Sequence, residues 1–404
     1  MIRTTRTLVA AGLLLLAGVT LAGDGQRQPG LNPAAAAELR EVGLDRYVGQ
    51  AQVIFENDIG NGWTQHTFDP AGGAGPLCIA GTPYSVYTRI RNPKKVMIFL
   101  QGGGACWQDF YFCNVLAEAQ APDTVSEFTG VFGDSFEDGP RTIKNPLRNW
   151  SIVYLPYCDG SVFNGDNDVF DPAFGQAIGV PEAVVRFHRG LRNATAGIDM
   201  AKSMFPGAKR VLVAGSSAGG VGAVGMAPFL TRLAFGNRVD LRVFNDAGPV
   251  AVNVFDVQAV LQRAADWQFG QFYPPSCLGC DPLGQGGTAL IDWRLSNDSG
   301  IREAFYSTDG DGTNRFFLRV PTQADYRGLL LSEHGALNAA HPDRYKRFIR
   351  SGDARHIALQ DDQYYLNRAD DTRLVDWMGA FLRARGNAGP WQDIVEDFVP
   401  LPAP

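Results

Sequence analysis

The chain is short of histidine and has no concentrated run of basic residues. It carries 36 Lys and Arg against 42 Asp and Glu, a formal net charge of −6, and only five histidines in 404 residues. Binding to phosphate backbones needs clustered Lys and Arg, so the sequence excludes a nucleic-acid partner. No internal repeat or long low-complexity run is present. The length and the 45% hydrophobic content allow a large buried core.

Patterns that would bind a metal or a nucleotide are also missing. The segment 309–312 reads Asp-Gly-Asp-Gly, but a calcium loop of the EF-hand kind needs a glycine where Asn314 stands and a glutamate where Val320 stands. The glycines at 102–104 lack the lysine of a phosphate-binding P-loop. We therefore expect no metal and no organic cofactor.

The N-terminus has the pattern of an export signal. Arg3 and Arg6 precede an apolar run, 8–21, that ends in small residues around Ala22. The run is short for a membrane span, and no cysteine follows it to carry a lipid anchor. We expect a signal peptide over 1–22, a polar, alanine-rich linker over 23–40 and a single domain over 41–404. The mature protein would have no membrane span and would be secreted or periplasmic, with a retained N-terminal anchor as the alternative.

An even number of cysteines in an exported chain favours disulfides. The six are Cys78, Cys106, Cys113, Cys158, Cys277 and Cys280. A zinc site at Cys277 and Cys280 would need two further ligands, but the sequence has no second CxxC and no nearby histidine pair. We expect a short disulfide loop there.

Strand-like runs alternate with helix-length segments along the chain. The expected strands are 51–56, 84–90, 95–100, 150–155, 210–214, 241–244 and 302–307, and the expected helices include 181–205, 219–235 and 374–382. This alternation predicts an α/β fold with a mostly parallel central sheet and helices on both faces. The segments 105–145 and 251–298 are too long for ordinary connections, so we expect inserted loops that shape a site.

Residues 215–219 read Gly-Ser-Ser-Ala-Gly, between a strand-like run and a stretch of small residues compatible with a helix. This is the sequence form of a nucleophile elbow, a sharp turn that holds its central serine exposed above a sheet. The glycines keep Cβ atoms out of the tight turn. The pattern indicates Ser217 as a catalytic nucleophile, with a plain Gly/Ser turn as the alternative.

A serine nucleophile needs a base, in the hydrolase chain order serine, acid, histidine. His66 and His188 precede the elbow and break this order, and His188 is expected on a helix as a surface or packing residue. We favour His356, which follows a regular segment and a turn, over His334 and His341. The latter two lie in a Gly/Ala/Asn-rich connection typical of solvated turns.

The acid has three candidates after the elbow. Asp309 and Asp311 follow the expected strand 302–307, and Asp246 ends an earlier strand-like run. A solvated turn is the alternative for the Asp/Gly cluster.

The oxyanion formed during acyl transfer needs backbone N–H donors. The strand-like run 95–100 leads into Gly102, Gly103 and Gly104, as in the HGGG-type motif of esterases. Glycines let backbone N–H groups point into a site with no side chain between. Ala218, next to the nucleophile, is the other expected donor.

Together these motifs resemble the pectin acetylesterase and Notum family of carbohydrate and lipid esterases, a branch of the α/β-hydrolases. The matching segments are 100–106, 157–166 and 215–220, and the resemblance covers roughly residues 75–385. It implies an α/β-hydrolase fold for the domain 41–404, with disulfides Cys106–Cys113 and Cys78–Cys158. The resemblance implies Ser217 as nucleophile, Asp311 as acid and His356 as base. Asn314 stands in place of the family's glutamine after the acid, and Tyr364 or Tyr365 and residues 376–377 support the histidine. The implied oxyanion donors are Gly103 or Gly104 together with Ala218.

The sequence departs from the family pattern at three positions. Gln101 and Ala105 replace the Glu and Trp common in the glycine motif, and Ser216 replaces a Cys often found before the nucleophile. Ala105 alters a pocket wall, whereas the oxyanion donors are backbone groups, so the departures bear on substrate rather than on reaction class.

The resemblance implies an exported serine esterase that removes acyl groups from a carbohydrate such as pectin. Acetyl is the favoured acyl group. The alternative within the enzyme class is a lipid or polyester esterase. The alternative outside it is a non-catalytic polysaccharide-binding protein on the same fold. A full set of serine, aspartate and histidine speaks against that last alternative.

Overall fold

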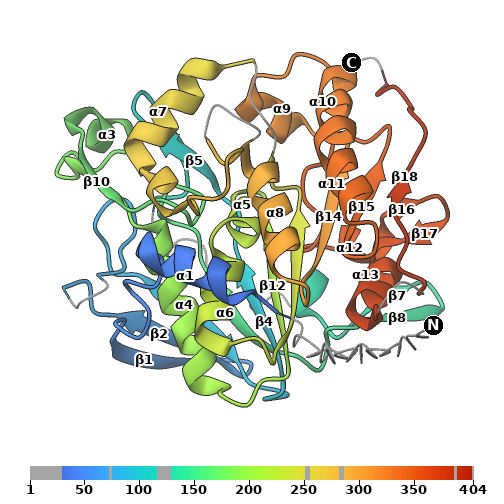
Figure 1. Cartoon of the computed structure of the whole chain (residues 1–404), viewed down its shortest axis with the longest axis horizontal. Coiled ribbons are helices and arrows are strands. Elements are labelled where there is room, and N and C mark those ends of the chain that lie inside the picture. Colours follow the sequence, from blue (N-terminus) through green and yellow to red (C-terminus); the bar gives the residue numbers. More distant parts are fainter. Residues whose placement is uncertain are drawn as a thin grey trace, which may run out of the picture.

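The computed structural model describes residues 30–71, 75–115, 129–250, 255–281, 286–385 and 389–402. The expected signal peptide, 1–22, and the first part of the expected linker lie outside these ranges. Within them the chain forms one large sheet flanked by helices (Figure 1).

The large sheet is mostly parallel, as the sequence predicts. From β9 to β18 all neighbouring strands are parallel, whereas β1, β2 and β3 extend one edge in antiparallel pairs. The strand order is β1 (Val53–Gly60), β2 (Trp63–Phe68), β3 (Ser85–Arg89), β9 (Ser151–Leu155), β4 (Lys95–Leu100), β12 (Arg210–Ser216), β13 (Asp240–Asp246), β14 (Arg302–Thr308), β15 (Tyr345–Arg350) and β18 (Ile394–Val395).

Helices and small hairpins surround this sheet. The helices are α1 (Pro33–Glu41), α3 (Pro172–Ala177), α4 (Gly190–Met204), α5 (Ala218–Val224), α6 (Ala227–Phe235), α7 (Val257–Trp267), α8 (Gly286–Asn297), α9 (Gly312–Leu318), α10 (Gln323–Leu329), α11 (Gly335–Ala340), α12 (Gln363–Leu366) and α13 (Leu374–Arg383). The hairpins pair β5 (Gly104–Trp107) with β6 (Phe110–Cys113), β7 (Ser135–Asp138) with β8 (Arg141–Lys144), β10 (Asn167–Phe170) with β11 (Val185–His188) and β16 (Arg368–Ala369) with β17 (Thr372–Arg373). Within the described ranges, no single helix is long and apolar enough to cross a bilayer, and α5 with α6 passes that test only as a pair bent by 47°.

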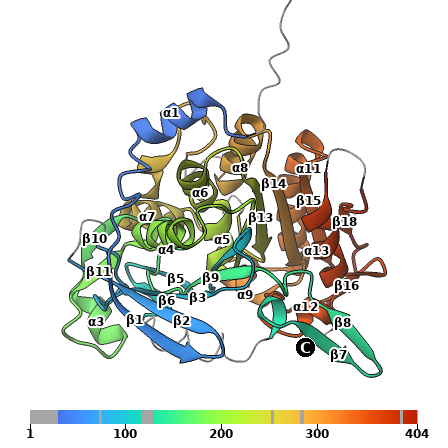
Figure 2. The same cartoon turned by 90° about the horizontal axis from the view of Figure 1, so that it is seen from below.

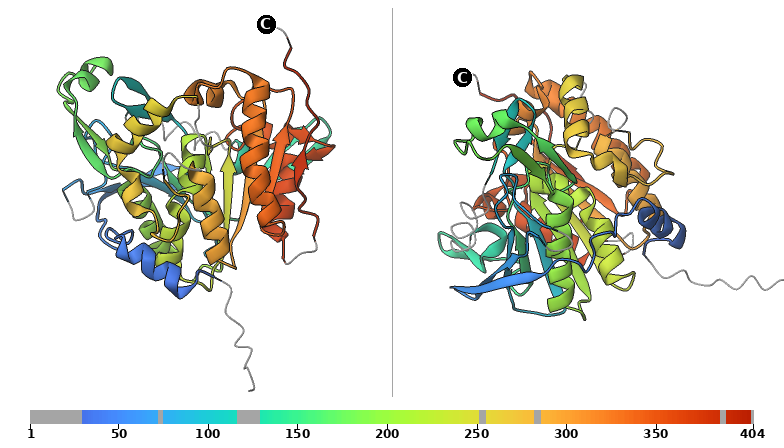
Figure 3. Two further views of the ribbon diagram at one scale, coloured as in Figure 1. Left: turned by 45° about the horizontal axis from the view of Figure 1, so that its top comes forward. Right: turned by 90° about the vertical axis from the view of Figure 1, so that its left-hand side faces the viewer.

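Alternate side chains of the central strands pack into two separate hydrophobic cores. Ile98 packs with residues of α4, α6 and α8, whereas its neighbour Phe99 packs with residues of α12 and α13. Successive strand residues point to opposite faces, so both faces of the parallel strands are covered (Figure 2). The segment that carries α7 lies beyond the C-terminal ends of the parallel strands (Figure 3).

The expected linker is wrong for residues 33–40. Asn32 caps α1 by accepting a hydrogen bond from the Ala35 N–H at 2.8 Å, and Pro33 occupies the first turn. Ala35 and Leu39, four residues apart, are buried in the core that also contains α4. The alanine-rich composition therefore marks a packed helix that belongs to the domain.

The expected helix 181–205 is wrong over its first part. Residues 185–188 form β11, which pairs antiparallel with β10, and α4 begins only at Gly190. Arg186 on this strand forms ion pairs with Asp171 and Asp266, each at 2.8 Å. These contacts come from segments distant in sequence, so local pattern could not show them.

All six cysteines are paired. The structure has disulfides Cys78–Cys158 and Cys106–Cys113, the pairings that the resemblance implies, and Cys277–Cys280. The Cys277–Cys280 disulfide confirms the short loop and rules out zinc ligation by those thiols. The first two bonds flank the glycine loop that follows β4, so they hold the surroundings of the expected site together.

Candidate active site

Ser217 lies at a strained turn between β12 and α5. Its backbone angles are φ 56° and ψ −121°, a conformation that L residues rarely adopt. A Cβ on Gly215 would come 2.1 Å from the Gly219 carbonyl oxygen, and one on Gly219 would come 2.0 Å from the Leu100 carbonyl oxygen. Only glycine fits at these two positions, which confirms the expected reason for the pattern.

Asp311 and His356 meet at the C-terminal ends of β14 and β15. His356 Nδ1 lies 2.6 Å from Asp311 Oδ2, although 45 residues separate them. The other oxygen, Asp311 Oδ1, accepts the Asn314 N–H at 2.8 Å and caps α9. Asp311 is fully buried, so one carboxylate fixes both the start of α9 and the orientation of the imidazole ring.

The second ring nitrogen of His356 is buried and has no hydrogen-bond partner among the described residues. Ser217 and His356 are therefore not joined by a hydrogen bond here. Such bonds are often long before substrate binds and tighten in the complex. In the described part of the chain, Nε2 is therefore the ring nitrogen without a partner, while Nδ1 contacts Asp311.

Asp309 has a structural environment. It is fully buried and accepts hydrogen bonds from Gln323, Arg327 and Ser351 at 2.8, 2.8 and 2.6 Å. The Gly352 N–H also donates to it, at 3.2 Å. The solvated turn considered for the Asp/Gly cluster is wrong, because these contacts remove Asp309 from water and fill both of its oxygens.

Asp246 connects the elbow to the histidine loop. It accepts the Ser216 hydroxyl at 2.6 Å and the backbone N–H groups of Ala358 and Leu359 at 3.0 and 2.9 Å. The residue is fully buried, and burial raises its pKa to about 6 against the effect of these donors. Asp246 therefore links Ser216, the residue before Ser217, to the loop that carries His356 but makes no hydrogen bond to the imidazole.

Asp246→Asn should change the pH dependence of stability. A carboxyl has a pKa near 3.9 when unfolded. The native state therefore binds the proton more tightly between about pH 4 and pH 6, and the stability due to this group falls as pH rises through that window. We expect the difference in unfolding free energy, wild type minus variant, to shrink by on the order of 2 kcal/mol between pH 4 and pH 7. Urea denaturation at both pH values measures it, with the exposed Asp362→Asn as control. An unchanged difference would contradict the assignment.

His334, His341 and His188 make structural contacts. His334 is fully buried, stacks on Phe305 with ring centroids 3.9 Å apart and bonds the Tyr345 hydroxyl at 2.6 Å, so the expected solvated turn is wrong for it. His341 pairs with the exposed Asp292. His188 lies on β11 rather than on a helix and is buried between Arg186 and the Asp159 carbonyl.

Two of the three expected oxyanion donors line the pocket that contains Ser217. Gly104 and Ala218 line the same pocket as Ser217. Gly104 has φ +79°, and a Cβ there would come 1.9 Å from the Phe112 carbonyl oxygen. Gly103 packs against Asn114 and Tyr157 instead, where a Cβ would clash with both side chains. Of the expected donors, Gly104 and Ala218 are the two that line the pocket with Ser217.

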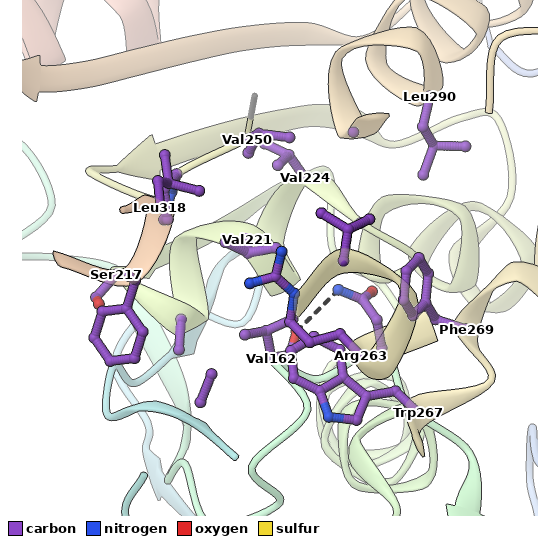
Figure 4. A pocket seen from close by; sticks show the side chains of 18 of the residues that line it. Val162, Ser217, Val221, Val224, Val250, Arg263, Trp267, Phe269, Leu290 and Leu318 are labelled. Atoms are coloured by element: carbon purple, nitrogen blue, oxygen red, sulfur yellow. Dashed lines mark hydrogen bonds between the residues drawn. The ribbon is translucent and has the colours of Figure 1, made fainter. Parts of the chain in front are cut away.

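A pocket of about 190 Å³ opens at Ser217 (Figure 4). The two long inserted segments supply much of its wall, as the sequence predicts: Ala105 and Trp107 come from the first, and α7 and α8 come from the second. The wall is mostly apolar. Its apolar side chains include Trp107, Val162, Val221, Val224, Val250, Trp267, Phe269, Leu290, Phe317 and Leu318.

Sequence reasoning missed two features of this site. One is the positioning role of Asp246, for which its place at the end of a strand was the only signal. The other is Arg263, which α7 brings into the pocket wall. No local pattern around Arg263 distinguishes it from an ordinary surface residue of a helix.

A sequence model of the pectinacetylesterase family matches residues 65–268. Pectin acetylesterase 11 of Arabidopsis thaliana is 32% identical over 156 residues, which cover 37% of this chain and 37% of that protein. Palmitoleoyl-protein carboxylesterase notum1a of Danio rerio is 29% identical over 158 residues, which cover 36% of this chain and 27% of that protein. The chain thus spans about a third of the length of these curated relatives.

Among solved structures, the Wnt deacylase Notum from Drosophila has the same fold. It superposes with a TM-score of 0.53 over 85% of this chain and 96% of its own length, at 17% sequence identity. The expected α/β-hydrolase fold is confirmed.

Proposed function

This chain belongs to the pectinacetylesterase family, and from that premise we propose that it is an exported serine esterase that removes acetyl groups from a carbohydrate such as pectin. The observation that carries the proposal is the pairing of His356 with Asp311 at 2.6 Å, together with a strained Ser217 that lines a pocket. A packing role for the pair would not need an unpartnered Nε2. The three disulfides support export, since they persist in oxidising compartments.

In the proposed reaction, Ser217 Oγ attacks the ester carbonyl carbon while His356 Nε2 takes its proton. The Asp311 carboxylate stabilises the imidazolium through Nδ1, and the N–H groups of Gly104 and Ala218 bind the oxyanion. The alcohol leaves with the proton from His356. A water molecule, deprotonated by the same nitrogen, then releases the acid and restores Ser217.

A second candidate is an esterase for longer acyl chains. The pocket is larger and more apolar than an acetyl group requires, and the relative from Danio rerio is named for a palmitoleoyl ester. A single profile separates the two candidates. It compares aryl esters of acetate, butyrate, octanoate and palmitate, together with acetate release from acetylated pectin and xylan.

We expect a fluorophosphonate probe to label Ser217, the rate of ester hydrolysis to be highest for short acyl groups, and acetate to be released from pectin. If the rate of hydrolysis were highest for long acyl chains, the second candidate, an esterase for longer acyl chains, would replace the acetylesterase. Failure of both labelling and hydrolysis would instead leave a non-catalytic polysaccharide-binding protein, and the proposed reaction would be wrong.

A further inference from the structure

Arg263 introduces a positive charge into a mostly apolar pocket wall. It lies on α7, is only partly exposed and lines the same pocket as Ser217. In Figure 4 its guanidinium extends from α7 into the space between Ser217 and Phe269. Its neighbours in the wall include Val221, Val224 and Trp267.

The Arg263 guanidinium has no hydrogen bond or ion pair with any residue that the structure describes. It lies over the Trp107 ring at 5.0 Å from the centroid, and Asp256 acts on it only as a more distant charge. Three buried arginines have carboxylate partners. Arg186, Arg232 and Arg294 each contact a carboxylate, at 2.8, 2.5 and 2.6 Å.

Helix α7 is held firmly, so Arg263 has a defined position. The Trp267 indole N–H donates to the Cys106 carbonyl at 2.8 Å. Asp266 accepts the Gln108 N–H at 2.7 Å and bonds Gln262 on the same helix at 2.9 Å. Both anchors lie within one turn of Arg263 and attach α7 to the β5–β6 hairpin.

A partly buried cation that lacks an ionic partner gains from a ligand that supplies one. Burial lowers the pKa of Arg263 to about 10, so the group stays protonated at neutral pH. A planar guanidinium matches a carboxylate through two parallel hydrogen bonds. A plain fatty acyl chain would place methylene groups against this charge and gain nothing from it.

We propose that Arg263 is a specificity residue that binds a carboxylate carried by the ester substrate. This inference rests on the proposed esterase function. The carboxylate has two sources, the acyl part of the ester or its alcohol part, and in both cases Arg263 anchors the anionic end while the carbonyl lies at Ser217. The reaction itself is unchanged.

Matched ester pairs distinguish the two sources. For the acyl part, the pair is the mono-p-nitrophenyl ester of glutaric acid and p-nitrophenyl valerate. For the alcohol part, it is 4-acetoxybenzoate and its methyl ester. We expect the wild-type protein to favour the charged member of one pair by tenfold or more in kcat/KM. The pair that shows this preference identifies whether the carboxylate belongs to the acyl part or to the alcohol part.

Arg263→Gln should remove this preference, with a loss of about tenfold to a hundredfold for the charged ester and less than threefold for the neutral one. Arg263→Lys should recover part of it. Arg383→Gln is the matched control, because it removes the same charge from an exposed position on α13. Thermal unfolding checks that each variant is folded. Equal losses for both members of a pair, or no preference in wild type, would overturn the inference.

Calorimetric titration with glutarate and with benzoate separates this inference from the proposed function. Binding to the Ser217→Ala protein that Arg263→Gln weakens tenfold supports the carboxylate site even if no ester is hydrolysed. Hydrolysis of esters with no carboxylate preference and no such binding would leave the esterase proposal standing and reject the role of Arg263.

Discussion

Replacing Ser217 with alanine should lower kcat for a small acetyl ester by a factor of about 10⁴ to 10⁶. The reason is that the acyl group would have no nucleophile to accept it, while the oxyanion donors and the pocket remain. Labelling by a fluorophosphonate should disappear with the activity. Initial rates on an aryl acetate, measured beside the thermal unfolding midpoint, check the expectation.

The fold should survive this change, because Ser217 makes no side-chain hydrogen bond to cap α5. Alanine would occupy the same strained backbone, held by the hydrogen bond from the residue 217 N–H to the Asp246 carbonyl at 2.8 Å. The exposed Ser332→Ala is the matched control and should keep full activity. Activity of the Ser217→Ala protein within tenfold of wild type would contradict the nucleophile assignment.

Asp311→Asn should lower kcat by about 10² to 10⁴, with little change in stability. An amide cannot stabilise the imidazolium, and it can hold His356 in the wrong tautomer. The cap of α9 should persist, since asparagine accepts the Asn314 N–H as well as aspartate does. Steady-state kinetics across pH 5–9 and thermal unfolding separate the two effects.

Asp309→Asn is the variant to compare with Asp311→Asn. Asp309 accepts from Gln323, Arg327 and Ser351 in a buried cluster, so its loss should cost roughly 2–4 kcal/mol of stability. The folded fraction should nevertheless keep nearly full kcat. If Asp309→Asn lost kcat and Asp311→Asn did not, the acid would be Asp309, and the contact between Asp311 and His356 would be structural only.

The sequence predicts well what depends on neighbouring residues. The elbow is a local turn, and its tight backbone contacts at Gly215 and Gly219 demand glycine, so the pattern carries its own physical reason. The strand β4 and the helix α13 follow from local apolar spacing in the same way. The linker prediction failed where composition was used alone, because the burial of Leu39 depends on distant helices.

The choice among acids needed the tertiary structure. Asp246, Asp309 and Asp311 all end strands or follow them, and sequence alone does not distinguish the three. In the fold, Asp311 meets His356, Asp309 binds Arg327 in a buried hydrogen-bonded cluster, and Asp246 binds the backbone after His356. Each outcome depends on a contact between residues at least 18 positions apart. The pairing of β13, β14 and β15 and the packing of α10 bring these residues together.

Sequence by itself thus determined the nucleophile turn, the glycine loop and the family to which both belong, because these are contiguous segments whose backbone geometry restricts the residue types. The tertiary structure alone decided which carboxylate orients His356, how Asp246 joins the two loops, and that Arg263 faces the pocket at Ser217 without a partner. Those outcomes depend on packing between distant elements. Packing is set by the whole sheet and its inserted segments rather than by any short run of residues.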